Sequence, residues 1–246
     1  MTKNFKLIIE YDGSRYHGWQ RQKNDLSIQG EIEKALKTMT QKSVTVIGSG
    51  RTDAGVHAEG QVANFKCDTP LKPEALLNGL NSLLAQDVTI MSCEQVDASF
   101  HARYDAKSKI YHYKILNRPQ PAAIGRQYLW FVRKALNREA MQAAIAHIIG
   151  RHNFKAFEGS GSPRQSSIRR VYSAGLSARE GGLLILHIEA DGFLRYMVRN
   201  IVGTLVDVGL EKRSPQDFKR ILDGKDRSQA SATAPAQGLI LMEVKY

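Results

Sequence analysis

Residues 50–58 have the sequence GRTDAGVHA, which presents one carboxylate, Asp53, in a short loop bounded by glycines. The β-branched run at 44–47 is typical of a buried strand, and the alternating residues at 61–65 predict a second strand. Asp53 is therefore expected where a strand ends. Because little else in the loop is reactive, this aspartate is the first candidate for a functional group.

The neighbours of Asp53 suit a reactive carboxylate without requiring one. Gly50 and Gly55 allow positive φ angles or close approach of a ligand to the backbone. Arg51 places a cation two residues away, which would keep the carboxylate ionised. An aspartate in such a loop can equally close an Asx-type turn or cap a short helix. Residue types alone leave both interpretations open.

The residues at 50–58 resemble the signature of the tRNA pseudouridine synthase A family, in which this aspartate is the catalytic residue. The resemblance covers nearly the whole chain in five ordered blocks. Besides the signature, the blocks are YDG at 11–13 with GWQ at 18–20, FHAR at 100–103 with YHY at 111–113, residues 193–202, and TAPA at 233–236. Five blocks in family order are a far more specific signal than one short match.

Three positions depart from the usual family pattern. Asn153 stands where an aspartate is common, Ser231 replaces a glycine and Gln237 replaces a histidine. None of them is the expected nucleophile, so the departures bear on loop geometry and on the choice of uridine rather than on the reaction type.

The periodicity of the apolar residues predicts an α+β fold with mainly antiparallel sheets. In the first half we expect strands at 5–11, 61–65 and 88–96, and helices that begin at Ser27 and Pro73. In the second half we expect strands at 107–116, 168–178, 183–190 and 239–246. We expect helices there at 138–149, from Phe193 onward, and from Ser214, where SPQD predicts a capping box.

The chain has 246 residues, which is enough for two domains of about 120 residues each. We place the boundary near residue 105, which gives an N-terminal domain at 1–105 and a C-terminal domain at 106–246. The family resemblance implies the pseudouridine synthase fold: two α/β-sandwich domains whose sheets join across a basic RNA-binding cleft, with the catalytic loop at its floor.

The composition indicates an anionic partner. Lys and Arg number 35 against 24 Asp and Glu, and the net charge of +11 favours nucleic acid or an acidic membrane surface. Apolar stretches of membrane length and a signal-peptide core are lacking, so we expect a cytoplasmic protein that binds nucleic acid and no membrane. The resemblance implies that the partner is the anticodon stem-loop of tRNA and that the protein is a homodimer.

The sequence predicts neither a metal site nor a cofactor. Cys67 and Cys93 are too few for a disulfide framework and lack metal-ligand spacing. The histidines lack the partners of a zinc motif, and both a phosphate-binding loop and a dinucleotide-binding glycine motif are missing. For His57 and His101 we expect structural hydrogen bonds. The chemistry should therefore rest on other side chains.

Tyr111 lies in a predicted strand among basic residues, an interleaving suited to stacking a base and neutralising phosphate. By composition alone it could equally be an aromatic residue packed in a sheet. The family resemblance makes Tyr111 the expected stacking residue of the active site.

Arg195 and Arg199 are four residues apart, so on the helix predicted from Phe193 they would share one face. A solvated basic face is the ordinary interpretation of such a pair. The resemblance instead implies that Arg199 reaches the catalytic aspartate, and a two-bond pair with Asp53 would hold the carboxylate ionised and oriented. Arg195 has weaker support and could equally contact phosphate, whereas Asn200 is expected to be structural.

Residues 14–23 interleave cations, amides and aromatics beside glycines, as expected of a flexible loop that contacts RNA. The candidate substrate-binding residues in this loop are Arg15, Tyr16, Trp19 and Arg21. A polar surface loop is the alternative. Residues 162–167, with Arg169 and Arg170, form a second candidate arm, for which disorder is the stronger alternative.

The resemblance implies conversion of uridine to pseudouridine at positions 38, 39 and 40 of tRNA. The base must leave the stack to be reached, and Arg51 is our candidate for holding the displaced nucleotide. Asp53 would attack C1′ or remove the ribose 2′ proton, and Tyr111 could relay the proton lost from C5. The alternatives are a catalytically silent tRNA-binding or chaperone module on the same fold, and an RNA hydrolase. The hydrolase would need a second carboxylate, a histidine pair or a metal site.

Overall fold

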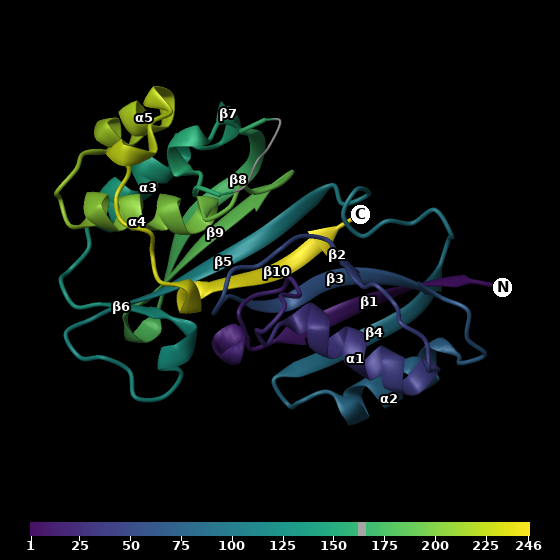
Figure 1. Ribbon diagram of the computed structural model, residues 1–246. Coiled ribbons are helices and arrows are strands. Elements are labelled where there is room, and N and C mark those ends of the chain that lie inside the picture. The colour runs from purple at the N-terminus through teal and green to yellow at the C-terminus, as the bar shows by residue number, and fades with distance from the viewer. Residues whose placement is uncertain (162–165) are drawn as a thin grey trace. The chain divides into compact units, whose positions relative to one another are not determined.

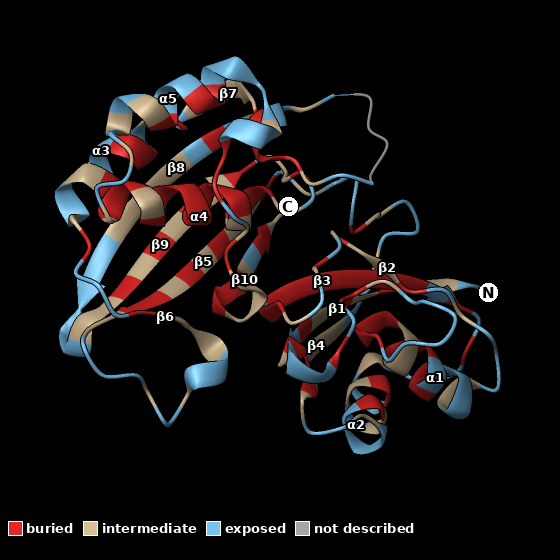
Figure 2. Ribbon diagram, turned by 60° about the vertical axis from the view of Figure 1, so that its left-hand side comes forward, coloured by how far each residue is buried: buried red, intermediate tan, exposed pale blue. Residues whose placement is uncertain are grey.

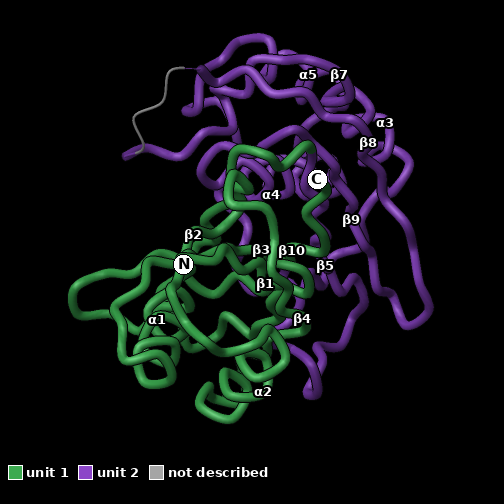
Figure 3. The backbone as a smooth tube through the Cα atoms, turned by 90° about the vertical axis from the view of Figure 1, so that its right-hand side faces the viewer, with its two compact units in different colours: residues 1–107, 240–246 green, residues 108–239 purple. Residues whose placement is uncertain are grey.

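The computed structural model describes residues 1–161 and 166–246, and the chain forms two compact units (Figure 1). The first unit contains residues 1–107 and 240–246, and the second contains 108–239, as Figure 3 shows by colour. The last residues of the chain therefore belong with the first unit, whereas the division expected at residue 105 leaves them with the second half.

The first unit is a sheet covered by two helices. The strands follow the order β4 (Val88–Val96), β1 (Lys3–Tyr11), β3 (His57–Cys67) and β10 (Leu239–Lys245), and the short β2 (Ile47–Gly48) also pairs with β3. All of these pairs are antiparallel except β3 with β10, which is parallel. The helices α1 (Ile28–Thr40) and α2 (Pro73–Leu83) pack against each other, and α2 packs on β4.

The core of this unit follows from the alternation in β1. Its apolar side chains Phe5, Leu7, Ile9 and Tyr11 are buried, and the ring of Phe5 stacks on that of Phe65 in β3 with centroids 5.2 Å apart. β3 is buried along almost its whole length, so it appears red in Figure 2. The loop that precedes β3, which carries Asp53, therefore leads into one of the most buried strands of the unit.

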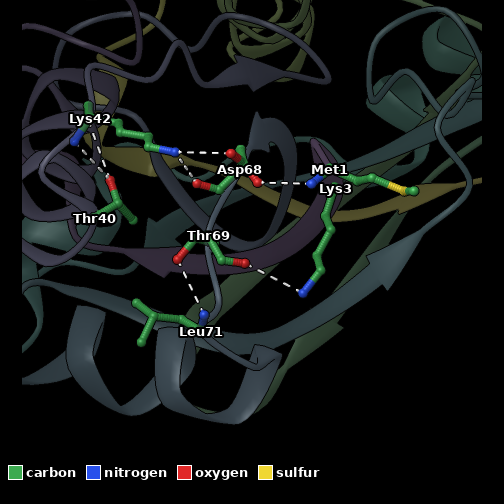
Figure 4. A network of polar contacts seen from close by, with 7 residues as sticks. All are labelled: Met1, Lys3, Thr40, Lys42, Asp68, Thr69 and Leu71. Carbon is green, nitrogen blue, oxygen red and sulfur yellow. Dashed lines mark hydrogen bonds and ion pairs between the residues drawn. The ribbon is translucent and has the colours of Figure 1, made fainter.

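A polar network joins the start of β1, the residues after β3 and the residues after α1 (Figure 4). Asp68, directly after β3, accepts from the amino group of Met1 at 3.1 Å and lies 3.3 Å from Nζ of Lys42, which follows α1. Lys3 Nζ donates to the carbonyl of Thr69 at 3.4 Å. The hydrogen bonds and charges of Met1 and Lys42 lower the pKa of Asp68. Because these groups are exposed, salt will screen the network.

The second unit is another mainly antiparallel sheet with three helices beside it (Figure 1). Its strands follow the order β5 (Ser108–Asn117), β9 (Leu183–Ala190), β8 (Ile168–Arg179) and β7 (Gly150–Asn153), all antiparallel, and β6 (Trp130–Val132) pairs with β5 in parallel. The helices are α3 (Arg138–Ala146), α4 (Met197–Gly209) and α5 (Pro215–Gly224), and α3 packs against β8 and both other helices.

Helix α4 forms the core of the second unit. Most of its residues are buried, which Figure 2 shows as an almost continuous red helix. The segment 230–236 crosses it closely: a Cβ atom on Gly203 would lie 1.9 Å from the carbonyl oxygen of Ala232. Glycine is required there because backbone meets backbone. Residues 230–236, which include TAPA, are thereby fixed against the helix.

The predicted α+β class with mainly antiparallel sheets is confirmed. The strands at 88–96 and 183–190 have the expected bounds, and the capping box at Ser214 forms with Asp217. Ser27, where the first helix was expected to begin, occupies the N-cap of α1, although its side chain makes no capping hydrogen bond. Of the candidate arm at 162–167, residues 162–165 lie outside the described residues.

The strand predicted at 44–47 is wrong except at its last residue, because β2 contains only Ile47–Gly48. Val46 is buried as expected, but side chains of α1 satisfy its backbone in place of a neighbouring strand. Its N–H donates to Oε1 of Glu33 at 3.0 Å, and its carbonyl accepts from Nε2 of Gln29 at 3.1 Å. The side-chain bonds explain how this buried backbone is stable without a strand partner.

The helix predicted from Phe193 begins only at Met197. Tyr196 has φ 59° and ψ 3°, a left-handed conformation that cannot continue a right-handed helix. Arg195 therefore lies in the turn before α4, and the prediction that Arg195 and Arg199 share a helix face is wrong.

Candidate active site

Asp53 lies in the loop between β2 and β3 and is half-buried. Its carbonyl oxygen accepts a hydrogen bond from Val56 N–H at 3.2 Å, and Gly55 has φ 77°, so the chain turns tightly directly after the aspartate. A glycine suits this position because other residues adopt a positive φ only with strain. The side chain of Asp53 is thus carried by a short, closed turn.

The loop after β1 holds the backbone on both sides of Asp53. Trp19 N–H donates to the carbonyl of Thr52 at 3.1 Å, and Gly55 N–H donates to the carbonyl of Tyr16 at 3.3 Å. The hydroxyl groups of Tyr11 and Thr52 are hydrogen-bonded at 2.8 Å. Burial raises the pKa of Tyr11 to about 12, so this phenol stays protonated at neutral pH. The turn is therefore fixed by two contacts from the loop and one from the end of β1.

Two glycines permit this close packing. A Cβ atom on Gly13 would lie 2.0 Å from the carbonyl oxygen of Val56, and one on Gly18 would lie 2.5 Å from that of Thr52. Gly18 also has φ 92°. Neither position can accept a side chain unless the loop of Asp53 moves.

We expect Gly18→Ala to lower the free energy of unfolding by about 3 kcal/mol, since it combines a positive φ with a steric clash. It should also slow catalysis roughly a hundredfold, because it displaces the loop of Asp53. Gly125→Ala is the matched control: Gly125 has φ 71°, but no atom lies within 4 Å of its added Cβ. Backbone strain alone should lower the control's free energy of unfolding, measured with urea, by about 1 kcal/mol. Equal losses of unfolding free energy in the two variants would show that the clash with the carbonyl of Thr52 adds nothing to the backbone strain.

His57 and Gln61 support the same loop from β3. His57 is buried, and its Nδ1 accepts from Gly13 N–H at 3.0 Å, which agrees with the structural role expected of it. Gln61 is fully buried: its Oε1 accepts from Ser49 Oγ at 2.7 Å, and its Nε2 donates to the carbonyl of Gly50 at 3.1 Å. Gln61 was not among the residues predicted from the sequence, although a polar side chain within a buried strand indicates a hydrogen-bonded role.

The candidate substrate-binding loop divides into exposed cations and buried aromatics. Arg15 and Arg21 are 66% and 64% exposed, although they contact Asp87 at 2.9 Å and Glu33 at 3.1 Å, respectively. Arg51, beside Asp53, is also exposed. These three arginines are therefore accessible to phosphate.

Tyr16 and Trp19 are only 3% and 2% exposed. The hydroxyl of Tyr16 donates to Oδ1 of Asp87 at 2.6 Å, and the ring of Trp19 packs so closely on Gly48 that an added Cβ would lie 2.5 Å away. This burial argues against the predicted direct contact of the two aromatic rings with RNA. They shape the loop, and their backbones hold the turn of Asp53.

The second unit carries the other predicted residues, Tyr111 and Arg199. Tyr111 lies on β5, is 8% exposed, and meets the ring of Phe193 edge to face at 4.9 Å. Arg199 lies on α4, where its Nε donates to the carbonyl of Ala234 at 2.8 Å and its guanidinium lies 5.0 Å from the ring centre of Tyr196. Arg195 is exposed and donates to the carbonyl of Ser160 at 2.8 Å.

Asn200 fixes the segment that holds Arg199. It is fully buried, its amide donates to the carbonyl of Phe157 at 2.8 Å, and its Oδ1 accepts from Oγ1 of Thr233 at 2.6 Å and from Arg227 at 3.1 Å. Thr233 directly precedes Ala234, so Asn200 positions the carbonyl that Arg199 contacts. The structural role expected of Asn200 is consistent with these bonds.

Two of the departures from the family pattern have ordinary structural roles. Oδ1 of Asn153 accepts from the backbone N–H of Lys155 at 3.0 Å and from Ser167 Oγ at 2.9 Å, bonds that an aspartate could also accept. Ser231 is buried, and its backbone N–H donates to Oγ1 of Thr204 at 3.2 Å. Gln237 lies in a short 3-10 helix before β10.

The predicted chemical groups are thus divided between the units: Asp53 and Arg51 in the first, Tyr111 and Arg199 in the second. The direct pair between Asp53 and Arg199 stays a prediction. Across residues 1–161 and 166–246, no group of three or more His, Cys, Asp or Glu side chains could hold a metal ion. Within the described part of the chain, no helix is both long and apolar enough to cross a membrane.

The chain is similar to known proteins along its whole length. A family model described as tRNA pseudouridine synthase matches residues 7–105 and 144–246. The chain is 46% identical to tRNA pseudouridine synthase A of Thermoanaerobacter sp. (strain X514), over 99% of this chain and all of the relative. It is 45% identical, with the same coverage, to the proteins of that name from Clostridium acetobutylicum and Acetivibrio thermocellus. Asp53, Arg51 and Arg199 all fall within the residues that match the family model.

Proposed function

The chain belongs to the tRNA pseudouridine synthase family, and on this premise we propose that it is an isomerase that converts uridine to pseudouridine in tRNA. The observation that carries the proposal is the loop of Asp53. Its carboxylate is half-buried, and hydrogen bonds hold the backbone on both sides of the residue. A fixed carboxylate with a cation beside it is suited to nucleophilic or general-base chemistry. Substrate and product are isomers, so the reaction consumes no oxidant, reductant or second substrate, and we propose that the chain uses no cofactor.

The finer part of the proposal is the site of modification, uridines 38, 39 and 40 in the anticodon stem-loop. The family resemblance of the sequence motifs supports it. The net charge of +11 and the exposed Arg15, Arg21 and Arg51 supply cations for phosphates. A stacked uridine does not offer C1′ or C5 to the protein, so the nucleotide must turn out of the helix. Arg51, two residues from Asp53, would hold the displaced nucleotide in that position.

Asp53 begins the reaction by one of two routes. In the first it attacks C1′, and the bond from C1′ to N1 breaks as an ester to the ribose forms. In the second it removes the 2′ proton, and the same bond breaks by elimination. In both, the freed uracil turns and joins C1′ through C5. On the first route this breaks the ester bond to Asp53, and on the second C2′ takes its proton back from Asp53. The C5 proton then leaves, N1 gains a proton, and Asp53 is regenerated. Tyr111, held by Phe193, is the proposed stacking residue and proton relay.

Treatment of an unmodified tRNA transcript with the protein tests the proposal. A pseudouridine-specific chemical map should show conversion at positions 38 to 40, and the mass of the intact RNA should stay unchanged. Shortened RNA or free uracil would instead identify a hydrolase. Binding without conversion would identify a catalytically silent tRNA-binding or chaperone module, and either result would overturn the isomerase.

We further propose a homodimer that works in the cytoplasm, where its tRNA substrate would be found. The support is geometric: an anticodon arm with the tRNA body is larger than the face of one 27.5 kDa chain. Light scattering at micromolar concentration should give twice the mass of the chain. A monomer mass that persists with one tRNA bound per chain would refute the dimer.

A further inference from the structure

Tyr196 has a backbone conformation that its position does not explain. Four non-glycine residues in the described chain have a positive φ: Gln41, Tyr196, Glu211 and Lys225. Gln41 and Lys225 end α1 and α5, and Glu211 lies just after α4, where a left-handed residue is an ordinary way to end a helix. Tyr196 instead precedes α4, and its side chain makes no capping hydrogen bond. An outlier of this kind points to a function for the side chain.

The ring of Tyr196 lies close to two arginines. The guanidinium carbon of Arg195 lies 4.7 Å from the ring centre, and that of Arg199 lies 5.0 Å from it. Both distances are within the range of cation–π attraction. The ring therefore contacts Arg199, the arginine that the family resemblance pairs with Asp53.

The ring itself is also held in place by the backbone of Gly159. A Cβ atom on Gly159 would lie 2.3 Å from the ring, so the backbone of residue 159 packs directly against it. The backbone N–H of Gly159 donates to the carbonyl of Arg195 at 2.8 Å. Arg195 donates to the hydroxyl of Tyr196 at 3.0 Å and to the carbonyl of Ser160 at 2.8 Å. These contacts leave the ring little freedom to turn away from Arg199.

Arg199 is thus held by two different groups. Its Nε donates to the carbonyl of Ala234, the backbone of Ala234 donates to the carbonyl of Arg199 at 3.1 Å, and the ring of Tyr196 contacts the guanidinium. A hydrogen bond donated by Nε leaves the guanidinium plane free to rotate about the bond direction. A ring whose centre lies 5.0 Å from the guanidinium carbon restricts that rotation.

We propose that Tyr196 is a positioning residue, whose ring fixes the guanidinium plane of Arg199 for its contact with the reactive carboxylate. The catalytic consequence rests on the proposed function, whereas the contact with Arg199 does not. A merely structural role would require only a residue that tolerates the left-handed backbone. Asparagine would satisfy that requirement better than tyrosine.

Three variants separate the ring from the backbone conformation. Tyr196→Phe keeps the ring and removes the bond from Arg195. Tyr196→Asn tolerates the left-handed conformation but has no ring, and Tyr196→His tolerates it with a smaller aromatic ring. Gln41→Asn is the matched control, because Gln41 has φ 55° and lies at the end of α1 in the other unit.

The first readout requires no RNA. The Nε–H signal of Arg199, identified by its loss in Arg199→Lys, should carry a ring-current shift in the unaltered protein and in Tyr196→Phe. It should lose that shift in Tyr196→Asn and keep part of it in Tyr196→His. The thermal midpoint of Tyr196→Asn should stay within about 3 °C of the unaltered protein. If Tyr196→Asn does not fold, Tyr196→His decides the test.

The second readout is the single-turnover rate of pseudouridine formation. We expect the rates of Tyr196→Phe and Gln41→Asn to stay within about twofold of the rate of the unaltered protein. The rate of Tyr196→Asn should fall about tenfold or more, while its tRNA affinity changes less than about twofold. An unchanged Arg199 signal in a folded variant without the tyrosine ring would overturn the proposal, as would equal slowing of Tyr196→Phe. If the unaltered protein makes no pseudouridine, the proposed function fails, and the Arg199 signal still decides the role of Tyr196.

Discussion

Asp53→Asn is expected to reduce pseudouridine formation below detection while tRNA affinity stays within about tenfold. The substitution removes the anion that attacks C1′ or takes the 2′ proton, and it keeps the shape of the side chain. Affinity should instead come from Lys and Arg on phosphates, so it should fall steeply with salt in both proteins. Removal of a negative charge near phosphates could even tighten binding. A pseudouridine map and filter binding at two salt concentrations measure both quantities.

The control for Asp53→Asn is Asp223→Asn, which removes the same charge from the exposed pair with Lys219 on α5. Exposed pairs contribute little to stability, so this control should be fully active. If folded Asp53→Asn retains measurable turnover, Asp53 is not the reactive group, and His57 or another carboxylate must be reconsidered.

Arg199→Lys is expected to fail almost as badly as Arg199→Ala, with kcat reduced at least about a hundredfold in both. A lysine ammonium is a point charge and cannot reproduce the planar two-bond contact with a carboxylate. It would also lose the Nε–H bond to Ala234 and the contact of the guanidinium with the ring of Tyr196. Binding of tRNA should survive in both variants.

Arg220→Lys is the control for Arg199→Lys, because Arg220 pairs with Asp217 on the exposed side of α5. We expect it to leave kcat unchanged. Full activity of Arg199→Lys would show that charge alone matters at this position, or that Arg199 does not act on the reactive carboxylate.

Local sequence patterns predicted most of the helices and strands, because these elements are determined mainly by residues close together in the sequence. Alternation in β1 and β9 and the capping box of α5 depend on residues that are neighbours in the sequence. The start of α4 could not be predicted in this way. Phe193 through Met197 suit a helix by composition, but Tyr196 has a left-handed backbone, and its ring packs on Gly159, which is distant in the sequence. Such a contact is invisible to periodicity.

The candidate site was likewise predictable only in part, because contacts between residues distant in the sequence cannot be read from local patterns. The family signature located Asp53, Arg51 and the residues of the second unit, whereas their supports come from distant parts of the chain. Tyr16 and Trp19 resembled RNA contacts because they lie among cations, but Asp87 and Gly48 bury them. The role of Gln61 likewise depends on Ser49 and Gly50 lying against it in the fold.

The most direct test of the account is release of tritium from tRNA labelled at C5 of uridine. Formation of a bond between C1′ and C5 requires loss of the hydrogen at C5. The account predicts one tritium released for each uridine converted, from RNA whose backbone stays intact, and release that depends on Asp53. RNA cleavage or loss of uracil without tritium release would contradict it, as would stoichiometric release by Asp53→Asn.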